Sequence, residues 1–124
     1  MSKDEIIEKL DLLLESIHLI EDRYSKIQVP DDFVLTPEGV ILLDAISMRL
    51  QVIGELVKQM QKTNTLFLQR YTEIEWDKIA RLRDLVSHHY EQVDHEIIYD
   101  ICKVHIPKLN DVIQRMRFSL LDSR

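Results

Sequence analysis

The sequence predicts an all-α fold, and three observations lead to this prediction. The 124 residues include only two glycines and three prolines, so few positions interrupt a helix. Apolar residues recur three and four positions apart over long stretches, which is the period of one helix face. Charged residues occupy the positions between them, as on an amphipathic helix. The length suits a single domain, residues 1–124, with a core of its own.

The first predicted helix begins at Ser2, which has capping-box spacing with Glu5. Pro30 and the acidic pair after it break the pattern, so residues 28–35 are predicted to form a loop. The helix carries one apolar stripe, which comprises Ile6, Leu10, Leu13, Ile17, Ile20, Tyr24 and Ile27.

The second predicted helix begins after Thr36 and reaches about Gln61. Thr36 can cap it, and Pro37 suits the first helical position. Its apolar surface is broad enough to face the core on one side and a second copy of the protein on the other. Gly54 costs about 1 kcal/mol inside a helix, so we expect another helix to approach closely there.

The remaining chain predicts a short helix over residues 66–71 and a further helix whose core face comprises Trp76, Ile79, Leu82 and Val86. Asp94 can cap the last long helix. Pro107 falls inside the pattern of this helix, where proline removes a hydrogen bond and clashes with the preceding turn. We therefore expect a kink or two segments near Val104, and a frayed basic tail from Arg115 onward.

Charge and cysteine usage limit the function. The net charge of −6 opposes nucleic-acid binding, so any RNA contact has to come from a local basic patch. The single cysteine, Cys102, cannot form an internal disulfide, which favours a reducing cytoplasm. No stretch has the apolar length of a signal core or a membrane span.

Several kinds of site are excluded by the residues available. Glycine occurs only at positions 39 and 54, which rules out a Gly-rich phosphate loop, a dinucleotide fingerprint and a nucleophile elbow. A metal site could be imagined from four side chains whose spacing matches no strong template: His88, His89, Asp94 and His95. The sequence therefore predicts no cofactor and no metal.

Residues 83–90 are the one stretch in which a cation, two imidazoles, a hydroxyl and a phenol lie close together. A helix turns by about 100° per residue, so Arg83, Ser87 and Tyr90 share one face. His88 lies about 140° around the helix from Arg83. These two converge on one ligand more easily if the helix ends near His88, or if a second subunit completes the site.

The residue types suit RNA cleavage without a metal, in which the 2′-hydroxyl of the substrate attacks the adjacent phosphate. His88 titrates near neutrality and can act as base or acid. Arg83 can stabilise the charge gained in the transition state. Asp84, Ser87 and Tyr90 have supporting roles: Asp84 can fix the tautomer of His88, and Tyr90 can bind or position phosphate. The residues alone leave a simpler alternative open, an exposed helix end with ordinary ion pairs.

The motif, an Arg, four residues, a His, one residue and a Tyr, resembles the signature of the HEPN superfamily and, within it, the HepT-like toxins. The resemblance runs from about Glu38 to about Met116. It includes six further segments: Ile53-Gly54-Glu55, Glu73-Ile74-Glu75-Trp76, Asp77-Lys78-Ile79-Ala80, Val93-Asp94, Ile97-Ile98-Tyr99 and Ile106-Pro107-Lys108-Leu109.

This resemblance implies an antiparallel bundle of four to five helices that forms a homodimer, with the two motifs meeting in a cleft. It implies that Arg83 and His88 are catalytic. It also implies a partner, a minimal nucleotidyltransferase antitoxin that silences the toxin by adding AMP to Tyr90. The chain departs from the family pattern at three positions beside the motif: His89, Glu91 and Gln92.

The sequence therefore predicts a cytoplasmic, metal-independent endoribonuclease toxin of a type VII-like toxin–antitoxin pair, acting on tRNA or mRNA. The rival hypothesis is a non-catalytic helical module whose cleft holds a nucleotidyltransferase or a nucleotide. The acidic net charge favours the module, and the intact motif favours the enzyme.

Overall fold

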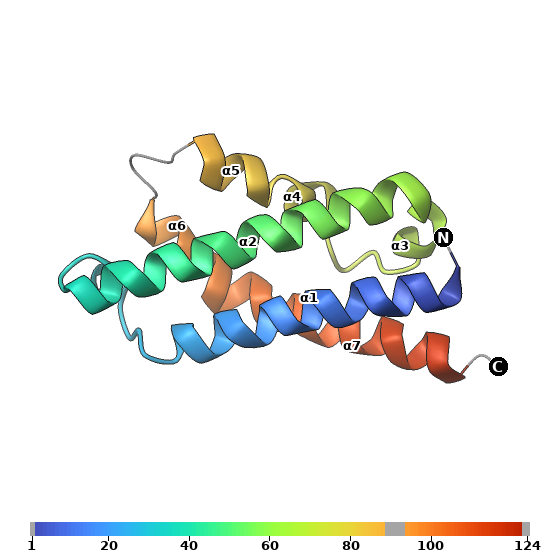
Figure 1. The fold of residues 1–124 in the computed structure, drawn as a ribbon, viewed down its shortest axis with the longest axis horizontal. Coiled ribbons are helices and arrows are strands. Elements are labelled where there is room, and N and C mark those ends of the chain that lie inside the picture. The colour runs from blue at the N-terminus through green and yellow to red at the C-terminus, as the bar shows by residue number, and fades with distance from the viewer. Residues whose placement is uncertain (1, 89–93, 123–124) are drawn as a thin grey trace.

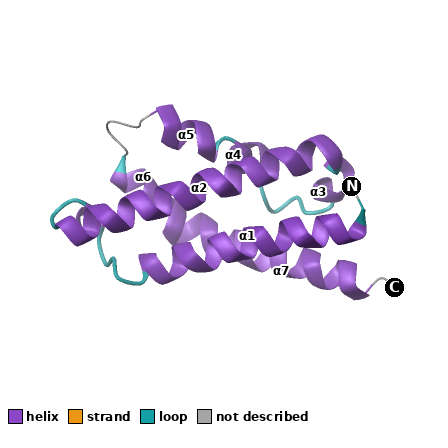
Figure 2. Cartoon of the chain, in the orientation of Figure 1, coloured by secondary structure: helices purple, strands orange, loops and turns teal. Residues whose placement is uncertain are grey.

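The computed structural model describes residues 2–88 and 94–122, and of Ser87 and His88 it describes the backbone. Within these ranges every regular element is a helix, which confirms the all-α class (Figures 1 and 2). The long helices are α1 (Lys3–Tyr24), α2 (Pro37–Thr63) and α7 (Ile106–Asp122).

The long helices lie side by side and form a bundle with the shorter ones (Figure 1). α1 packs against α2, which runs in the opposite direction, and α7 returns along the other side of α1. α4 (Trp76–Ala80) and α5 (Leu82–His88) follow one another back along α2. Successive long segments therefore alternate in direction, as the resemblance to HEPN proteins implies.

The first helix begins where its sequence predicts and ends at Tyr24, three residues before the predicted end at Ile27. The Ser2 hydroxyl accepts a hydrogen bond from the Glu5 backbone amide at 3.2 Å. The apolar stripe is buried from Ile6 to Ile20, and Ile27 is buried after the helix ends. The predicted loop also contains a 3₁₀ turn, η1 (Pro30–Phe33), whose Phe33 is completely buried. Sequence periodicity did not identify Phe33 as a core residue.

The second helix is two residues longer than predicted and begins at the expected cap. The Thr36 hydroxyl accepts a hydrogen bond from the Gly39 amide at 3.0 Å. One side of α2 is buried along its whole length. On the other side, Ile41 is 66% exposed and Met48 is 57% exposed, so part of the broad apolar surface has no cover within this chain.

The last helix is divided before Pro107, as the proline predicts. α6 (His95–Asp100) continues into η2 (Ile101–His105), a π-helical turn, and then into α7. The π-type bond runs from the Ile106 amide to the Ile101 carbonyl. This wider turn accommodates a proline that cannot donate a hydrogen bond to the preceding turn.

The expectation of a frayed tail is wrong over most of its length. α7 stays helical to Asp122. Arg117 Nε lies 2.6 Å from Asp11 Oδ1 of α1, and Arg115 pairs with Glu73. Buried Met116 also fixes this part of the helix. Among residues 2–88 and 94–122, no helix has the length and apolar character needed to span a membrane.

Candidate functional site

The candidate site lies on the α4–α5 segment, whose apolar side chains attach it to the bundle. Trp76, Ile79, Leu82 and Val86 are all buried, as predicted. The indole of Trp76 also donates a hydrogen bond to the Tyr71 carbonyl at 3.1 Å. The predicted single helix is wrong in one detail, because it is interrupted at Arg81 and forms two short helices.

Gly54 explains how close the α4–α5 segment comes to α2. A Cβ atom at position 54 would lie 2.8 Å from the Arg83 backbone nitrogen and 3.2 Å from the Ala80 carbonyl oxygen. The first of these distances is shorter than real Cβ contacts, so a side chain at position 54 would force the two helices apart. The predicted close helix approach at Gly54 is therefore confirmed, and the helix that approaches carries Arg83.

The Arg83 side chain extends from this contact toward solvent and pairs with α2. Its Nη1 lies 3.2 Å from Glu55 Oε2, and the two side chains are 54% and 43% exposed. Exposed ion pairs of this kind contribute about 0–1 kcal/mol to stability. The simpler alternative, an ordinary surface ion pair, thus describes what Arg83 does in the free protein. The same exposure leaves the guanidinium accessible to an anionic ligand.

Other motif residues are only partly described. The Asp84 side chain is exposed in α5. The helix backbone extends to His88, so Arg83 and His88 lie on one helix. The side chains of Ser87 and His88 lie outside the described part of the chain, as do His89, Tyr90, Glu91 and Gln92 entirely. The predicted convergence of Arg83 and His88 therefore remains a prediction.

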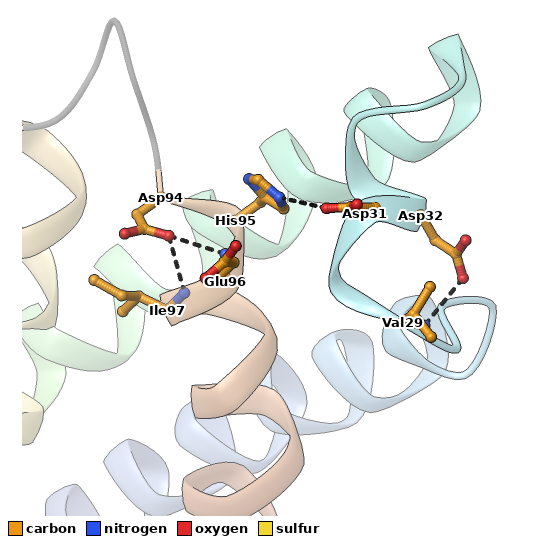
Figure 3. A network of polar contacts seen from close by, with 7 residues as sticks. All are labelled: Val29, Asp31, Asp32, Asp94, His95, Glu96 and Ile97. Carbon is orange, nitrogen blue, oxygen red and sulfur yellow. Dashed lines mark hydrogen bonds and ion pairs between the residues drawn. The ribbon is translucent and has the colours of Figure 1, made fainter.

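α6 (His95–Asp100) is anchored at its N-terminus and along its side. The Asp94 carboxylate accepts hydrogen bonds from the Glu96 and Ile97 amides at 3.0 and 3.2 Å, which confirms the predicted cap. Figure 3 shows His95 directed at Asp31 of η1, with Nε2 3.1 Å from Oδ1. Tyr99 adds a hydrogen bond to the Gln28 carbonyl at 2.9 Å. α6 is therefore fixed to the α1–α2 connection.

These contacts occupy two of the four side chains considered as metal ligands. Asp94 caps α6 and His95 faces Asp31 (Figure 3). Among the side chains that the structure describes, those of residues 2–86 and 94–122, no group of three or more His, Cys, Asp or Glu is arranged to hold a metal ion.

Sequence reasoning missed two features near the motif. Glu55 was noticed only as part of the family pattern, and its contact with Arg83 spans 28 residues of sequence. The position of Gly54 was the available signal, since a close helix approach there brings the next side chain of α2 near the partner helix. The second feature is a basic pocket beside Arg81, which is described below.

Comparisons with known proteins identify a family for this chain. A family model described as ribonuclease HepT-like matches residues 13–116. The match begins earlier than the resemblance seen in the sequence and includes half of α1. No solved structure matches the chain significantly.

Three curated relatives illustrate the similarity. A "Gamma-glutamylcyclotransferase and putative RNase" of Methanocaldococcus jannaschii is 35% identical over 107 residues, which cover 86% of this chain and 45% of that protein. A "Putative RNase" of the same organism is 40% identical over 68 residues, 55% of this chain and 52% of that protein. A "Probable ribonuclease HepT" of Thermococcus cleftensis is 30% identical over 108 residues, 87% of this chain and 92% of that protein.

The chain thus spans about half the length of the first two relatives and nearly all of the third. The family model covers most of the chain, from α1 to α7. An all-helical bundle is the fold that the resemblance to this family implies. The chain belongs to the ribonuclease HepT-like family.

Proposed function

We propose that this protein is an endoribonuclease that cleaves RNA without a metal ion and acts as the toxin of a toxin–antitoxin pair. Membership of the ribonuclease HepT-like family supports the activity. The observation that carries the proposal is the position of Arg83, whose backbone is fixed against Gly54 while its guanidinium remains exposed. A rigid backbone with an accessible cation suits a residue that binds a phosphate.

The proposed reaction is an intramolecular transfer within the RNA strand. The 2′-oxygen of one nucleotide bonds to the adjacent phosphorus, and the bond from phosphorus to the 5′-oxygen of the next nucleotide breaks. His88 accepts the proton of the 2′-hydroxyl as base, and an imidazolium returns a proton to the leaving oxygen as acid. The products are a 2′,3′-cyclic phosphate and a 5′-hydroxyl end.

Arg83 supplies the electrostatic part of this mechanism. The attacked phosphate gains negative charge in the transition state, and a guanidinium can donate two parallel hydrogen bonds to its oxygens. Glu55 engages Nη1 in the free protein. The guanidinium has five N–H donors, so it can bind a phosphate after a small rotation. Asp84 and Ser87 support His88 and the phosphate in this proposal.

A homodimer is the proposed functional form. Ile41, Met48, partly buried Val52 and Glu55 follow one another at spacings of seven, four and three residues, so they share one face of α2. The uncovered apolar part of this face therefore continues into the Glu55–Arg83 pair. A second copy covering it would bring the two motifs together. Sedimentation at micromolar concentration tests this, and a monomer would contradict it.

Regulation by AMP addition to Tyr90 is the proposed role of the partner, a minimal nucleotidyltransferase. The added phosphate would compete for Arg83, and the adenosine would fill the cleft. Intact mass measurement after incubation with the cognate enzyme and ATP should show added AMP on the wild type and not on Tyr90→Phe. AMP found on Tyr71 or Tyr99 instead would contradict this assignment.

A binding module without catalysis is the second candidate, and the net charge of −6 favours it. Purified protein incubated with tRNA and mRNA in EDTA separates the two candidates. The enzyme predicts fragments with cyclic phosphate ends, and a substrate with a single 2′-deoxynucleotide at the cleavage position should stay intact. Loss of cleavage in EDTA would reject the metal-free mechanism, and no cleavage under any condition would favour the module.

A further inference from the structure

A pocket of about 390 Å³ lies on the α4–α5 segment, apart from the Glu55 contact of Arg83. Its other wall is formed by η2 and the first turn of α7. Pockets that hold small ligands usually measure about 300–1,000 Å³. The volume is therefore sufficient for a ligand of the size of one nucleotide.

The π-helical turn contributes one wall of this pocket. Ile101 and His105, the first and last residues of η2, both line it, and Lys108 follows one turn later. The turn ends at His105, two residues before Pro107. Helices widened in this way are rare and are frequently found at functional sites. The π-helical turn therefore lines this pocket as well as part of the hydrophobic core.

The floor of the pocket is aliphatic. It is formed by Ile79 and Leu82 from one side and Ile101 from the other, with Leu85 half-buried at the edge. Such a surface suits a flat, weakly polar group, because contact with it removes apolar area from water. A free inorganic anion would gain nothing from this floor.

The rim carries an excess of positive charge. Glu75 is already paired with Lys78 at 2.6 Å, and Glu73 is paired with Arg115. His105 Nε2 lies 4.0 Å from Asp100 Oδ2, at the limit of an ion pair. Among the described residues, no ion pair joins Arg81 or Lys108 to a carboxylate. Arg81 Nε donates a hydrogen bond to the Asp77 backbone carbonyl at 3.3 Å. Its other guanidinium nitrogens and the Lys108 ammonium can bind a ligand.

The carboxyl of Glu75 reports this local field. Its hydrogen bond with Lys78 holds its pKa below the usual value, and His105 and Lys108 lower that pKa further through their charges. A basic rim on a protein of net charge −6 is the kind of local patch that any RNA contact requires here.

We propose that this pocket is a nucleotide subsite, which takes a base on its aliphatic floor and a phosphate at Arg81, His105 and Lys108. The nucleotide could come from the RNA strand bound at Arg83 or from a free mononucleotide. Arg81 precedes Arg83 by two residues, and Leu85 precedes His88 by one helical turn. The claim that the nucleotide belongs to an RNA strand rests on the proposed ribonuclease function. The claim that the pocket binds a nucleotide does not.

Equilibrium binding tests the proposal without requiring cleavage. The probes are AMP, CMP, GMP and UMP, and a fluorescent oligoribonucleotide whose 2′-O-methyl groups prevent cleavage. The variants are Arg81→Gln and Lys108→Gln, both at exposed positions, and the matched control is Lys26→Gln, an exposed lysine beyond α1. Melting temperatures establish that each variant is folded.

Both pocket variants should weaken binding of mononucleotide and oligonucleotide about tenfold. For the oligonucleotide, each variant should also reduce the slope of log affinity against log salt by about 1. Lys26→Gln should change neither. If AMP competes with the oligonucleotide, the pocket takes a nucleotide of the bound RNA strand. If both bind at the same time, the pocket takes a free mononucleotide. Either result supports a nucleotide subsite.

Three results would overturn the subsite. These are unchanged affinity in both pocket variants, displacement by inorganic phosphate as effective as displacement by AMP, and no binding of either probe by the wild type. Cleavage of unmodified RNA is measured separately. A wild type that binds the probes through the pocket but never cleaves RNA would reject the proposed ribonuclease and leave the subsite intact.

Discussion

The α1–α2–α7 bundle and the α4–α5 segment differ in how much of each helix is committed to the core. The long helices bury nearly continuous rows of side chains, including Leu13, Leu50 and Leu109 at 0% exposure. α5 buries Leu82 and Val86 and presents Arg83 and Asp84 to solvent. The difference indicates that stability is concentrated in the bundle and the candidate chemistry in the segment attached to it.

The largest expected effect is on stability and lies in the bundle. Leu13→Ala removes a completely buried side chain of α1 and should lower the free energy of unfolding by about 2–5 kcal/mol. Leu12→Ala, the adjacent residue at 40% exposure, is the matched control and should cost less than about 1 kcal/mol. Chemical denaturation measures both. Equal losses would mean that the bundle does not carry the stability in this way.

Gly54→Ala tests the junction between the two regions. The new Cβ would meet the backbone of Arg83 at 2.8 Å, so α5 must move, at a cost of about 1–3 kcal/mol. The control is Gly39→Ala, whose Cβ would meet the Asp32 carbonyl of η1 at 2.0 Å, away from the motif.

At a temperature at which both glycine variants are folded, Gly54→Ala should lose RNA cleavage and Gly39→Ala should retain more of it. Similar activity per folded molecule in the two would show that the position of α5 relative to α2 does not control the site.

Glu55→Gln should have a smaller effect and should separate binding from stability. It removes the negative charge beside Arg83 while keeping the shape of the side chain. Because the pair is exposed, the melting temperature should change little. RNA affinity should rise a few-fold, since Glu55 no longer competes with phosphate for the guanidinium. A loss of affinity would instead make Glu55 a residue that positions Arg83.

The last effect is absent at neutral pH and appears only at alkaline pH. Burial raises the pKa of the Cys102 thiol from 9.0 to about 12. The folded state therefore keeps a proton that the unfolded state releases, so stability is lost as pH rises above about 9 toward 12. Burial also raises the pKa of Tyr24 and adds to this trend. Comparison of the wild type with Cys102→Ala isolates the contribution of the thiol. The free energy of unfolding of Cys102→Ala should fall less steeply as pH rises above about 9, and identical slopes for the two proteins would contradict this.

Sequence periodicity predicts most of the fold because the buried faces are helical. The core face from Trp76 to Val86 and the cap at Asp94 follow from spacing and residue type alone. Phe33 could not be predicted in this way, since a single aromatic residue in a turn has no period. The continuation of α7 to Asp122 depends on contacts of Arg115 and Arg117 with residues far away in the sequence.

The candidate site was less predictable than the fold. The motif and the close approach at Gly54 could be identified from the sequence. The contact of Arg83 with Glu55 and the pocket rim at Arg81 and Lys108 could not, because both join segments that are distant along the chain. The residues proposed to act together with Arg83 lie among residues 87–90. Their roles are expected from the family pattern, because helix geometry alone does not predict them.

The central claim is that the α5 segment performs chemistry while the bundle maintains the fold. Its most direct test measures RNA cleavage in EDTA and thermal unfolding on the same samples of wild type, Arg83→Ala and His88→Ala. We predict that both variants lose cleavage while their helical circular dichroism and melting temperatures stay close to those of the wild type. Retained cleavage in either variant, or unfolding of His88→Ala, would contradict the assignment of these residues to catalysis.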